Sequence, residues 1–454
     1  MMAEQMLRAV LDDLKSDGTL MTCSTQVDPA FELGAVLQHF DSNQPILFEN
    51  VKGYRMPVVG GLYGTRKLMY RFLHTTKEER LYKIMGAIGD PVEPKVVEHA
   101  PVQENIIRKN INIRRLLPVP TSNGKDGGPY ITSGILVLKD PVNGRTLTAA
   151  RRFQVRENNM ISVLVSGASP YVRSILKDAR EAKRNVECAV VLGYDAYYLL
   201  ASQVGARYGL DKHALDGALR GEPLEVVKAT SVDLEVPANA EIVLEGYIPH
   251  DKMPEEGPFG ELMGYYGVVE PNPCMIVTTV THRNDPIYQH AFPCREEHLA
   301  NGMIREAETF SQLKTCVDVK DVNITIGGGC RLHCIISIAK RNEGDGKSAI
   351  LTALGANKDT KHVVVVDDDV DIYDPMDIEF AIASRVQAGK DVVIVPGALG
   401  SALEASHVAQ GVTDKMGIDA TAPLGEKHEL FERAVINGYE KKTDLDIRKY
   451  FPDL

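Results

Sequence analysis

The chain has 454 residues, of which 44% are hydrophobic and 25% charged, which is ordinary for a globular protein with room for two to four domains. Its 62 acidic and 51 basic side chains give a net charge of −11, which argues against non-specific binding to nucleic acid. There is no apolar run of about 18 residues, so no membrane span is expected, and residues 1–15 form a charged amphipathic pattern rather than a signal peptide.

The first hundred residues alternate helical and extended patterns. Helices are expected at 5–17 and 76–88, and a short buried strand at 45–48. The polar stretch 91–101 contains three prolines and is typical of a domain boundary. An N-terminal α/β domain is therefore predicted at residues 1–105.

The central part of the chain, residues 106–304, is rich in β patterns. Strands are expected at 131–138, 146–156, 160–165, 188–192, 240–247 and 275–281, with one helix at 170–183. Residues 140–144 contain an Asn-Gly pair and predict a hairpin turn. Several short strands joined by hairpin turns favour a small split barrel.

The last third, residues 305–454, returns to alternating strands and helices. The expected elements are a helix at 305–315, a buried strand at 363–366, a helix at 377–388 and a buried strand at 391–395. This order predicts a mostly parallel sheet. The amphipathic tail 427–454 is expected to dock on a partner subunit.

Two polar clusters in this last part have a structural and a metal-binding interpretation. Asp367, Asp368 and Asp369 end a buried strand, where they would bind Mg²⁺ or Ca²⁺ or, as we favour, cap backbone amides. Cys330 and Cys334 lie with a histidine in an apolar run, which favours core packing over a metal site. The seven cysteines are scattered without paired spacing, which suits a reducing cytoplasm.

Residues 256–261 (Glu-Gly-Pro-Phe-Gly-Glu) carry two carboxylates around a rigid turn, and we call them the acid loop. A proline between two glycines disfavours an ordinary helix or a central strand. A solvated surface turn is one interpretation. Phe259 argues against it, because a large apolar ring between glycines requires a pocket. A pair of carboxylates, Glu256 and Glu261, would suit general acid–base chemistry.

Cationic residues elsewhere supply candidate partners for these acids. Arg151 and Arg152 occupy one strand, so their side chains point to opposite faces, and one of them is expected inside against an acid such as Glu256 or Glu261. His298 and Arg305 would bind a carboxylate substrate near a helix N-terminus, unless they are structural. The phosphate-loop, nucleophile-elbow and dinucleotide-binding motifs are absent. The residues alone therefore indicate a cytoplasmic α/β enzyme with a carboxylate–arginine site.

The chain resembles the UbiD family of decarboxylases in the identity and order of its motifs. These are residues 127–132 (Gly-Gly-Pro-Tyr-Ile-Thr), 152–155 (Arg-Phe-Gln-Val), 217–221 (Gly-Ala-Leu-Arg-Gly), 244–247 (Leu-Glu-Gly-Tyr), the acid loop, and 366–373 (Val-Asp-Asp-Asp-Val-Asp-Ile-Tyr). The resemblance implies a split barrel between α/β parts and a homo-oligomer built from dimers. It also implies reversible decarboxylation of an aromatic, heteroaromatic or α,β-unsaturated acid with prenylated flavin mononucleotide (FMN), which a flavin prenyltransferase supplies.

The resemblance also assigns roles to residues. Glu261 would return a proton after CO₂ leaves, with Arg152 and Glu256 orienting it and the flavin. The cofactor-binding positions are Arg152, Gln154, Tyr171 and Lys212. The substrate-binding positions are Phe259, His298 and Arg305.

The family's metal site is where this sequence departs from the pattern. The family holds the flavin phosphate through a divalent metal bound by Asn, His and Glu, and those positions align with Leu147, Tyr171 (or Pro170) and Lys212. Neither Leu nor Lys replaces a carboxylate or amide ligand of a hard cation. Lys212 is therefore expected to offer its ammonium directly to the phosphate. A different chemistry on the same scaffold, or a non-catalytic partner subunit, remain the alternatives to a flavin-dependent decarboxylase.

Overall fold

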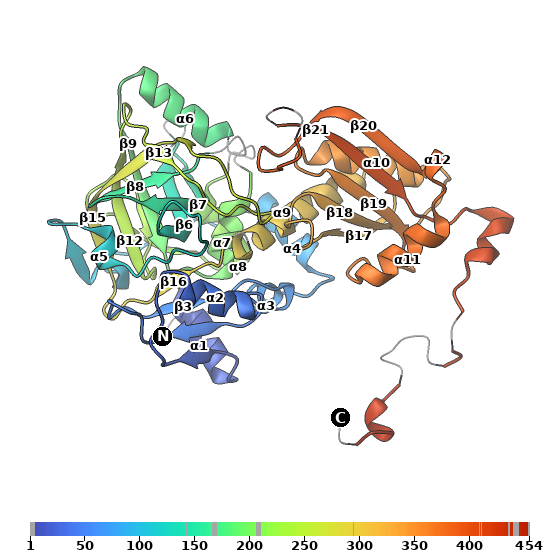
Figure 1. Ribbon diagram of the computed structural model, residues 1–454, viewed down its shortest axis with the longest axis horizontal. Helices are drawn as coiled ribbons and strands as arrows, with labels where there is room; N and C mark the ends of the chain where they lie inside the picture. Colours follow the sequence, from blue (N-terminus) through green and yellow to red (C-terminus); the bar gives the residue numbers. More distant parts are fainter. Residues whose placement is uncertain are drawn as a thin grey trace.

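The computed structural model describes residues 5–452 except 141–143, 166–169, 206–209, 294, 408, 410, 435 and 439–444, so most of the expected turn at 140–144 lies outside it. A β-barrel and a separate C-terminal sheet lie side by side, with the N-terminal helices and strands beneath the barrel (Figure 1). Helix α9 (Glu296–Leu313) runs between the barrel and the C-terminal sheet. Among the described residues, no helix has the length and apolarity that crossing a bilayer requires.

The N-terminal part is a small layer of helices and strands. Its elements are α1 (Leu7–Ser16), β1 (Met21–Cys23), α2 (Glu32–His39), β2 (Ile46–Phe48), β3 (Val58–Gly60), α3 (Arg66–Phe72) and α4 (Arg80–Gly89). The predicted helix at 5–17 and strand at 45–48 are confirmed. The second predicted helix begins at Arg80 rather than 76, because the Thr76 hydroxyl accepts a hydrogen bond from Glu79 N in a preceding turn. Strand β16 (Tyr288–His290) joins this sheet from much later in the chain.

Six strands close the central barrel, in the order β12-β9-β6-β7-β8-β15 with β12 paired to β15. They are β6 (Tyr130–Lys139), β7 (Thr146–Val155), β8 (Met160–Val163), β9 (Val186–Leu192), β12 (Ile242–Ile248) and β15 (Cys274–His282). The barrel and each of these strands were predicted. Around it lie β4 (Lys95–Val96), β5 (Asn105–Ile107), α5 (Ile113–Leu116), α6 (Pro170–Glu181), α7 (Ala196–Gln203), α8 (Lys212–Arg220), β10 (Glu225–Lys228), β11 (Glu235–Pro237), β13 (Glu255–Glu256) and β14 (Glu270–Pro271).

Strand β7 has two faces with different surroundings. Leu147 pairs with Leu138, and both belong to the apolar cluster that fills the barrel. Thr148 pairs with Val137, whose side chain belongs to the cluster formed with the outer helices. Side chains alternate along a strand, so Thr148 shares its face with Arg152, and α7 and α8 pack against this strand. Leu147 therefore points away from the face that carries Arg152.

The C-terminal sheet has the order β17-β18-β19-β21-β20. Its elements are β17 (Val319–Ile324), β18 (His333–Ile338), α10 (Asp345–Ala356), β19 (His362–Asp367), α11 (Pro375–Arg385), α12 (Ala388–Asp391), β20 (Val392–Leu399) and β21 (Val412–Asp419). The prediction of a mostly parallel sheet is wrong, because only the β18–β19 and β19–β21 pairs are parallel. The strand expected at 391–395 is present as β20, but it is not buried: it is an antiparallel edge strand, with Ile394 68% exposed.

Helix α9 begins nine residues earlier than predicted and crosses the expected domain boundary at 304/305. Its Glu296 carboxylate accepts hydrogen bonds from Gly61 N and Tyr63 N of the N-terminal layer. Further along, Glu306 is buried between Arg66 and Arg80, and Arg80 also reaches Asp321 at 2.7 Å. These ion pairs fasten α9 to both flanking parts, which fixes the side chains near its N-terminal end.

The two polar clusters of the last third have structural contacts. Asp367 and Asp369 pair with Arg385, and Asp374 caps α11 by accepting from Met376 N. Cys330 and Cys334 are buried in the apolar core. Among the described residues, there is no group of three or more His, Cys, Asp or Glu side chains that could hold a metal ion.

Candidate active site

The acid loop and β7 bring together the three residues predicted to be catalytic. Arg152 Nε and Nη2 donate to the two oxygens of Glu256, each at 3.1 Å, and Nη1 donates to Glu261 Oε1. Glu256 is completely buried, whereas Glu261 keeps some exposure. Burial opposes the charge of Arg152, but Glu261 and Glu256 outweigh it and raise its pKa well above the ordinary value.

Aromatic rings fix the plane of this guanidinium. The Arg152 guanidinium lies 4.6 Å from the centre of the Phe259 ring, which in turn packs at 4.6 Å on Tyr130. Phe259 is buried, as its position between glycines predicted. The acid loop is therefore not a solvated turn.

The neighbouring segment 127–130 seats the acid loop. Gly127 N donates to Pro258 O at 2.8 Å, and an added Cβ at Gly127 would lie 2.3 Å from Gly257 O, so only glycine fits. Gln154 donates to Gly127 O at 2.7 Å and accepts from Gly257 N at 3.4 Å. Gln154 was predicted to bind the cofactor, and in the structure its amide joins the two segments.

A pocket opens beside Arg152 and Glu261, between the central barrel part and the C-terminal part of the chain. Its lining comes from β6, β7, the end of β8, α7, the acid loop, α9 and the two loops of the C-terminal part. The lining residues are Thr132, Ala150, Arg151, Arg152, Leu164, Gln203, Phe259, Glu261, Glu297, His298, Arg331 and Leu403. We call it the active-site pocket.

A cationic cluster lies on the α9 side of this pocket. His298 and Arg305 are two turns apart on one face of α9, and Arg331 Nη2 lies 3.5 Å from His298 Nδ1. Arg305 and Arg331 share the carboxylate of Asp359, at 2.6 and 2.9 Å. Arg305 was expected near the helix N-terminus, but it lies nine residues into α9, about 14 Å along the axis.

Burial and mutual repulsion shift the pKa values in this cluster. Burial, followed by Arg331 and Arg305, lowers the pKa of His298 well below its ordinary value, so the imidazole is neutral. Burial and Arg331 lower the pKa of Arg305 to about 10 and that of Arg151 to about 10. Two guanidinium atoms, Arg305 Nη1 and Arg331 Nε, are buried with no hydrogen-bond partner among the described residues.

Sequence reasoning missed Arg331 and Asp359. The signal for Arg331 was the preceding glycine triplet at 327–329. Those glycines and Cys330, whose φ is 53°, turn the chain sharply so that Arg331 faces the pocket. Asp359 follows α10 in a polar turn, with no motif to mark it.

The positions aligned with the family's metal ligands do not form a metal-binding set. Leu147 faces the barrel interior, and the Tyr171 hydroxyl donates to Asp140 Oδ2. Lys212, at the start of α8, is 1% exposed and donates from Nζ to Val204 O at 2.5 Å. Lys212 is a cation, so its side chain is not a ligand for a divalent metal.

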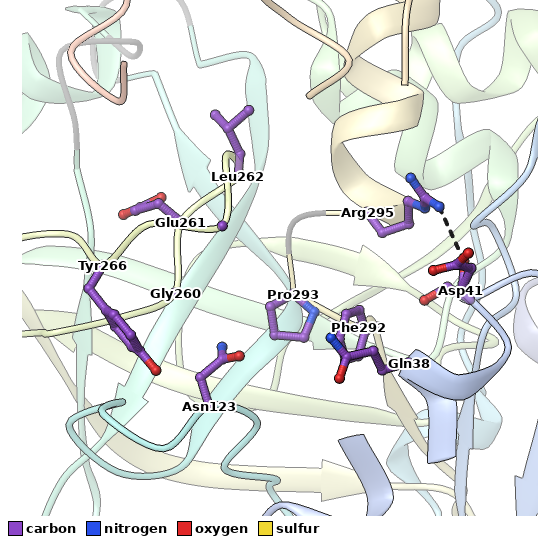
Figure 2. Close-up of a pocket in the computed structure, with 12 residues that line it drawn as sticks. Gln38, Asp41, Asn123, Gly260, Glu261, Leu262, Tyr266, Phe292, Pro293 and Arg295 are labelled. Carbon is purple, nitrogen blue, oxygen red and sulfur yellow. Dashed lines mark hydrogen bonds between the residues drawn. The ribbon is translucent and has the colours of Figure 1, made fainter. Parts of the chain in front are cut away.

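A second pocket lies against the acid loop next to the N-terminal layer (Figure 2). Asn123 and Pro293 line it, and at one side Arg295 Nη2 donates to Asp41 O at 3.4 Å. The carboxylate of Glu261 points away from Pro293 and Arg295. Glu261 also lines the active-site pocket, so the acid loop separates the two spaces.

Comparison with protein families matches nearly the whole chain to three consecutive domains of one enzyme type. The 3-octaprenyl-4-hydroxybenzoate carboxy-lyase N-terminal domain matches residues 11–88, its Rift-related domain residues 95–296, and its C-terminal domain residues 298–420. The anhydromevalonate phosphate decarboxylases of Methanosarcina mazei and Methanothermobacter thermautotrophicus are 36% and 34% identical, each over 94% of this chain and 99% of the relative.

Solved structures agree with this assignment. The UbiD-class enzyme HmfF from Pelotomaculum thermopropionicum in complex with FMN superposes with a TM-score of 0.94 at 42% identity, covering 98% of this chain and 99% of that one. The 3,4-dihydroxybenzoic acid decarboxylase AroY of Klebsiella pneumoniae gives 0.90 at 27% identity, covering 99% of each chain. The chain therefore belongs to the UbiD family, and it is a carboxy-lyase of the UbiD class.

Proposed function

We propose that this decarboxylase uses prenylated FMN to act on a conjugated carboxylic acid, aromatic, heteroaromatic or α,β-unsaturated, that carries a second anionic group. The cofactor part is supported by the Pelotomaculum enzyme, which is described in complex with FMN and, in an evolved dimeric form, with prenylated FMN. The pocket beside Arg152 is lined by the barrel, the acid loop, α9 and loops of the C-terminal part, which suits a cofactor and a substrate that bind together.

Different residues of the chain would carry out different steps of the reaction. When bound, prenylated FMN would supply a ring that accepts electron density as CO₂ departs. Arg152, held by Glu256 through two parallel hydrogen bonds, would orient the Glu261 carboxyl toward the pocket. Glu261, which lines the pocket, would then deliver the proton that replaces CO₂ on the substrate carbon.

The cationic cluster is the observation that carries the choice of substrate. Arg305 and Arg331 converge on a single carboxylate, Asp359, so this trio carries a net positive charge, and Glu308 is a further acid that acts on Arg305. Buried charges require partners, and Arg331 lines the pocket. A carboxylate or phosphate on the substrate, distant from the carboxyl group that leaves, would supply that partner. The two archaeal relatives are named for a phosphate-bearing substrate.

A different chemistry on the same scaffold, without prenylated flavin, is the remaining rival. The retained Arg152–Glu256–Glu261 network suits either case, because it moves a proton irrespective of the cofactor. The two functions differ in whether flavin-free protein is active.

The test compares two substrates that differ only in the second anion, furan-2,5-dicarboxylate and furan-2-carboxylate. In Arg331→Met, kcat/KM for the dicarboxylate should fall by roughly 10- to 100-fold, because a charged hydrogen bond is worth about 1.5–3 kcal/mol. The monocarboxylate should be affected much less. Arg341→Met is the matched control, because Arg341 is 73% exposed and does not line the pocket.

Equal losses for the two furan acids in Arg331→Met would refute the second-anion assignment. Decarboxylation by protein free of flavin, with no gain on adding prenylated FMN, would support the rival chemistry instead.

A further inference from the structure

Lys212 is a buried cation whose bonding capacity is mostly unused. Its ammonium has three donors, and the described residues provide one acceptor, Val204 O at 2.5 Å. Among these residues no carboxylate lies within ion-pair distance of it; burial lowers its pKa to about 8, although the charges of Glu308 and Asp211 act in the opposite direction. A buried lysine without an ion pair costs folding free energy, so its retention points to an anion that is bound in function.

The adjacent aspartate is not available as that partner. Asp211 caps α8 by accepting from His213 N at 2.9 Å and Ala214 N at 3.3 Å. Its other oxygen accepts from Thr146 N at 2.6 Å, which ties the start of α8 to the start of β7. These three hydrogen bonds hold the Asp211 carboxylate on backbone amides, and its charge raises the pKa of Lys212 without forming a direct ion pair among the described residues.

Two neighbours of Lys212 lie close to the active-site pocket in the chain or on the same strand face: Val204 and Thr148. Val204, which accepts from Lys212, directly follows Gln203 of the pocket lining. Thr148 lies on the outer face of β7 toward α7 and α8, and its buried hydroxyl has no hydrogen-bond partner among the described residues. Thr148 and Arg152 share this face, about 13 Å apart along the strand. A cofactor with its ring at Arg152 and its phosphate near Lys212 would span this length.

A divalent metal does not fit these residues. Of the three positions aligned with metal ligands, Leu147 lies in the barrel interior, Tyr171 bonds Asp140, and Lys212 is cationic. A hard cation requires several oxygen ligands, and a neighbouring ammonium would repel it.

We infer that Lys212 binds the phosphate of the flavin directly and takes the place of the divalent metal, with the Thr148 hydroxyl as a second donor. This inference rests on the proposed use of a flavin. An ammonium acts as a point charge on a phosphate, and a neutral hydroxyl adds direction to the site.

The test measures binding of two flavins that differ only in the phosphate, FMN and riboflavin, by quenching of flavin fluorescence on full-length protein freed of cofactor. In Lys212→Met, the Kd for FMN should rise by tenfold or more, while the Kd for riboflavin stays unchanged. EDTA should not weaken FMN binding to the unmodified protein. Lys212→Gln, which retains a donor for Val204 O, should give the same loss, so a folding defect of the Met variant would not obscure the result.

Lys415→Met is the matched control, because Lys415 is also buried and donates only to backbone carbonyls, those of Leu354 and Lys358. It should leave the FMN to riboflavin ratio unchanged. Equal ratios in Lys212→Gln and the unmodified protein, or FMN binding that EDTA abolishes and Mn²⁺ restores, would overturn the inference and leave the proposed function standing. Failure of the unmodified protein to bind either flavin would overturn both.

Discussion

At the scale of single residues, Glu256 and Glu261 share Arg152 but occupy different environments. Glu256 is completely buried and engages the guanidinium with both oxygens, whereas Glu261 lines the pocket and keeps some exposure. This asymmetry supports the proposal that Glu256 orients the arginine and Glu261 transfers the proton.

Glu261→Gln should lower kcat by about 10²–10⁴ without changing the absorbance of bound flavin, because the amide cannot deliver the proton. Glu255→Gln changes the exposed neighbour of Glu256 and serves as the control, with kcat expected to stay within about twofold. Steady-state kinetics measure both. A Glu261→Gln variant that keeps more than a tenth of its kcat would assign the proton to another group.

Residue identities could be predicted where a motif marked them, and not where only packing selects them. Arg152, Glu256, Glu261 and Phe259 lie in recognisable stretches, and the structure brings them together. Arg331 and Asp359 act through contacts between segments 28 residues apart, which have no local pattern. Leu147 was aligned with one of the family's metal-ligand positions, but strand alternation turns its neighbour Thr148, not Leu147, toward α7 and α8.

At the scale of elements, the position of the acid loop depends on its seat on segment 127–130. Gly127→Ala should lower kcat by tenfold or more, because the new Cβ would lie 2.3 Å from Gly257 O and push the loop and its carboxylates away from Arg152. Kinetics and a thermal unfolding curve separate this effect from a loss of fold.

Gly124→Ala is the control, three residues earlier in the same loop, since an added Cβ there meets no atom within 4 Å. Similar kcat values for the two alanine variants would mean that the seat does not position the acids.

Element boundaries were predicted least well where tertiary contacts set them. The start of α9 at Glu296 was missed although Glu296 and Glu297 are typical of a helix first turn. The predicted parallel sheet was wrong because β21 was not recognised as a strand. In the sequence β21 follows β20, and its residues show no pattern that distinguishes a strand from a loop. In the sheet it lies between β19 and β20. A strand–helix–strand order predicts that the two strands are parallel neighbours. Here β20, the strand that follows β19 in the sequence, instead pairs antiparallel with β21 at the edge of the sheet.

At the scale of the whole molecule, the C-terminal tail extends away from the body (Figure 1). Arg433 fastens it to α11 through Asp377 at 2.5 Å and to Asp369 at 3.1 Å. Apolar side chains on the described parts of the tail remain uncovered, with Leu430 82% and Ile436 73% exposed. Such side chains require a partner surface, and we propose that a second copy of the chain covers them in a homo-oligomer built from dimers.

The active-site pocket lies between the barrel and the C-terminal part. Helix α9 contributes to its lining, and ion pairs of Glu306 with Arg66 and Arg80 hold this helix against the N-terminal part. The order of the three parts was predictable from the motifs, whereas their junction at α9 required the structure.

The most direct test of a UbiD-class decarboxylase with a metal-free flavin site is a native mass spectrum, taken with an absorbance spectrum, of protein co-produced with a flavin prenyltransferase. We predict an even number of chains, one prenylated FMN per chain, and no added mass of a divalent ion. One metal ion per flavin would contradict the role of Lys212. Protein that is reproducibly free of flavin would contradict the account as a whole.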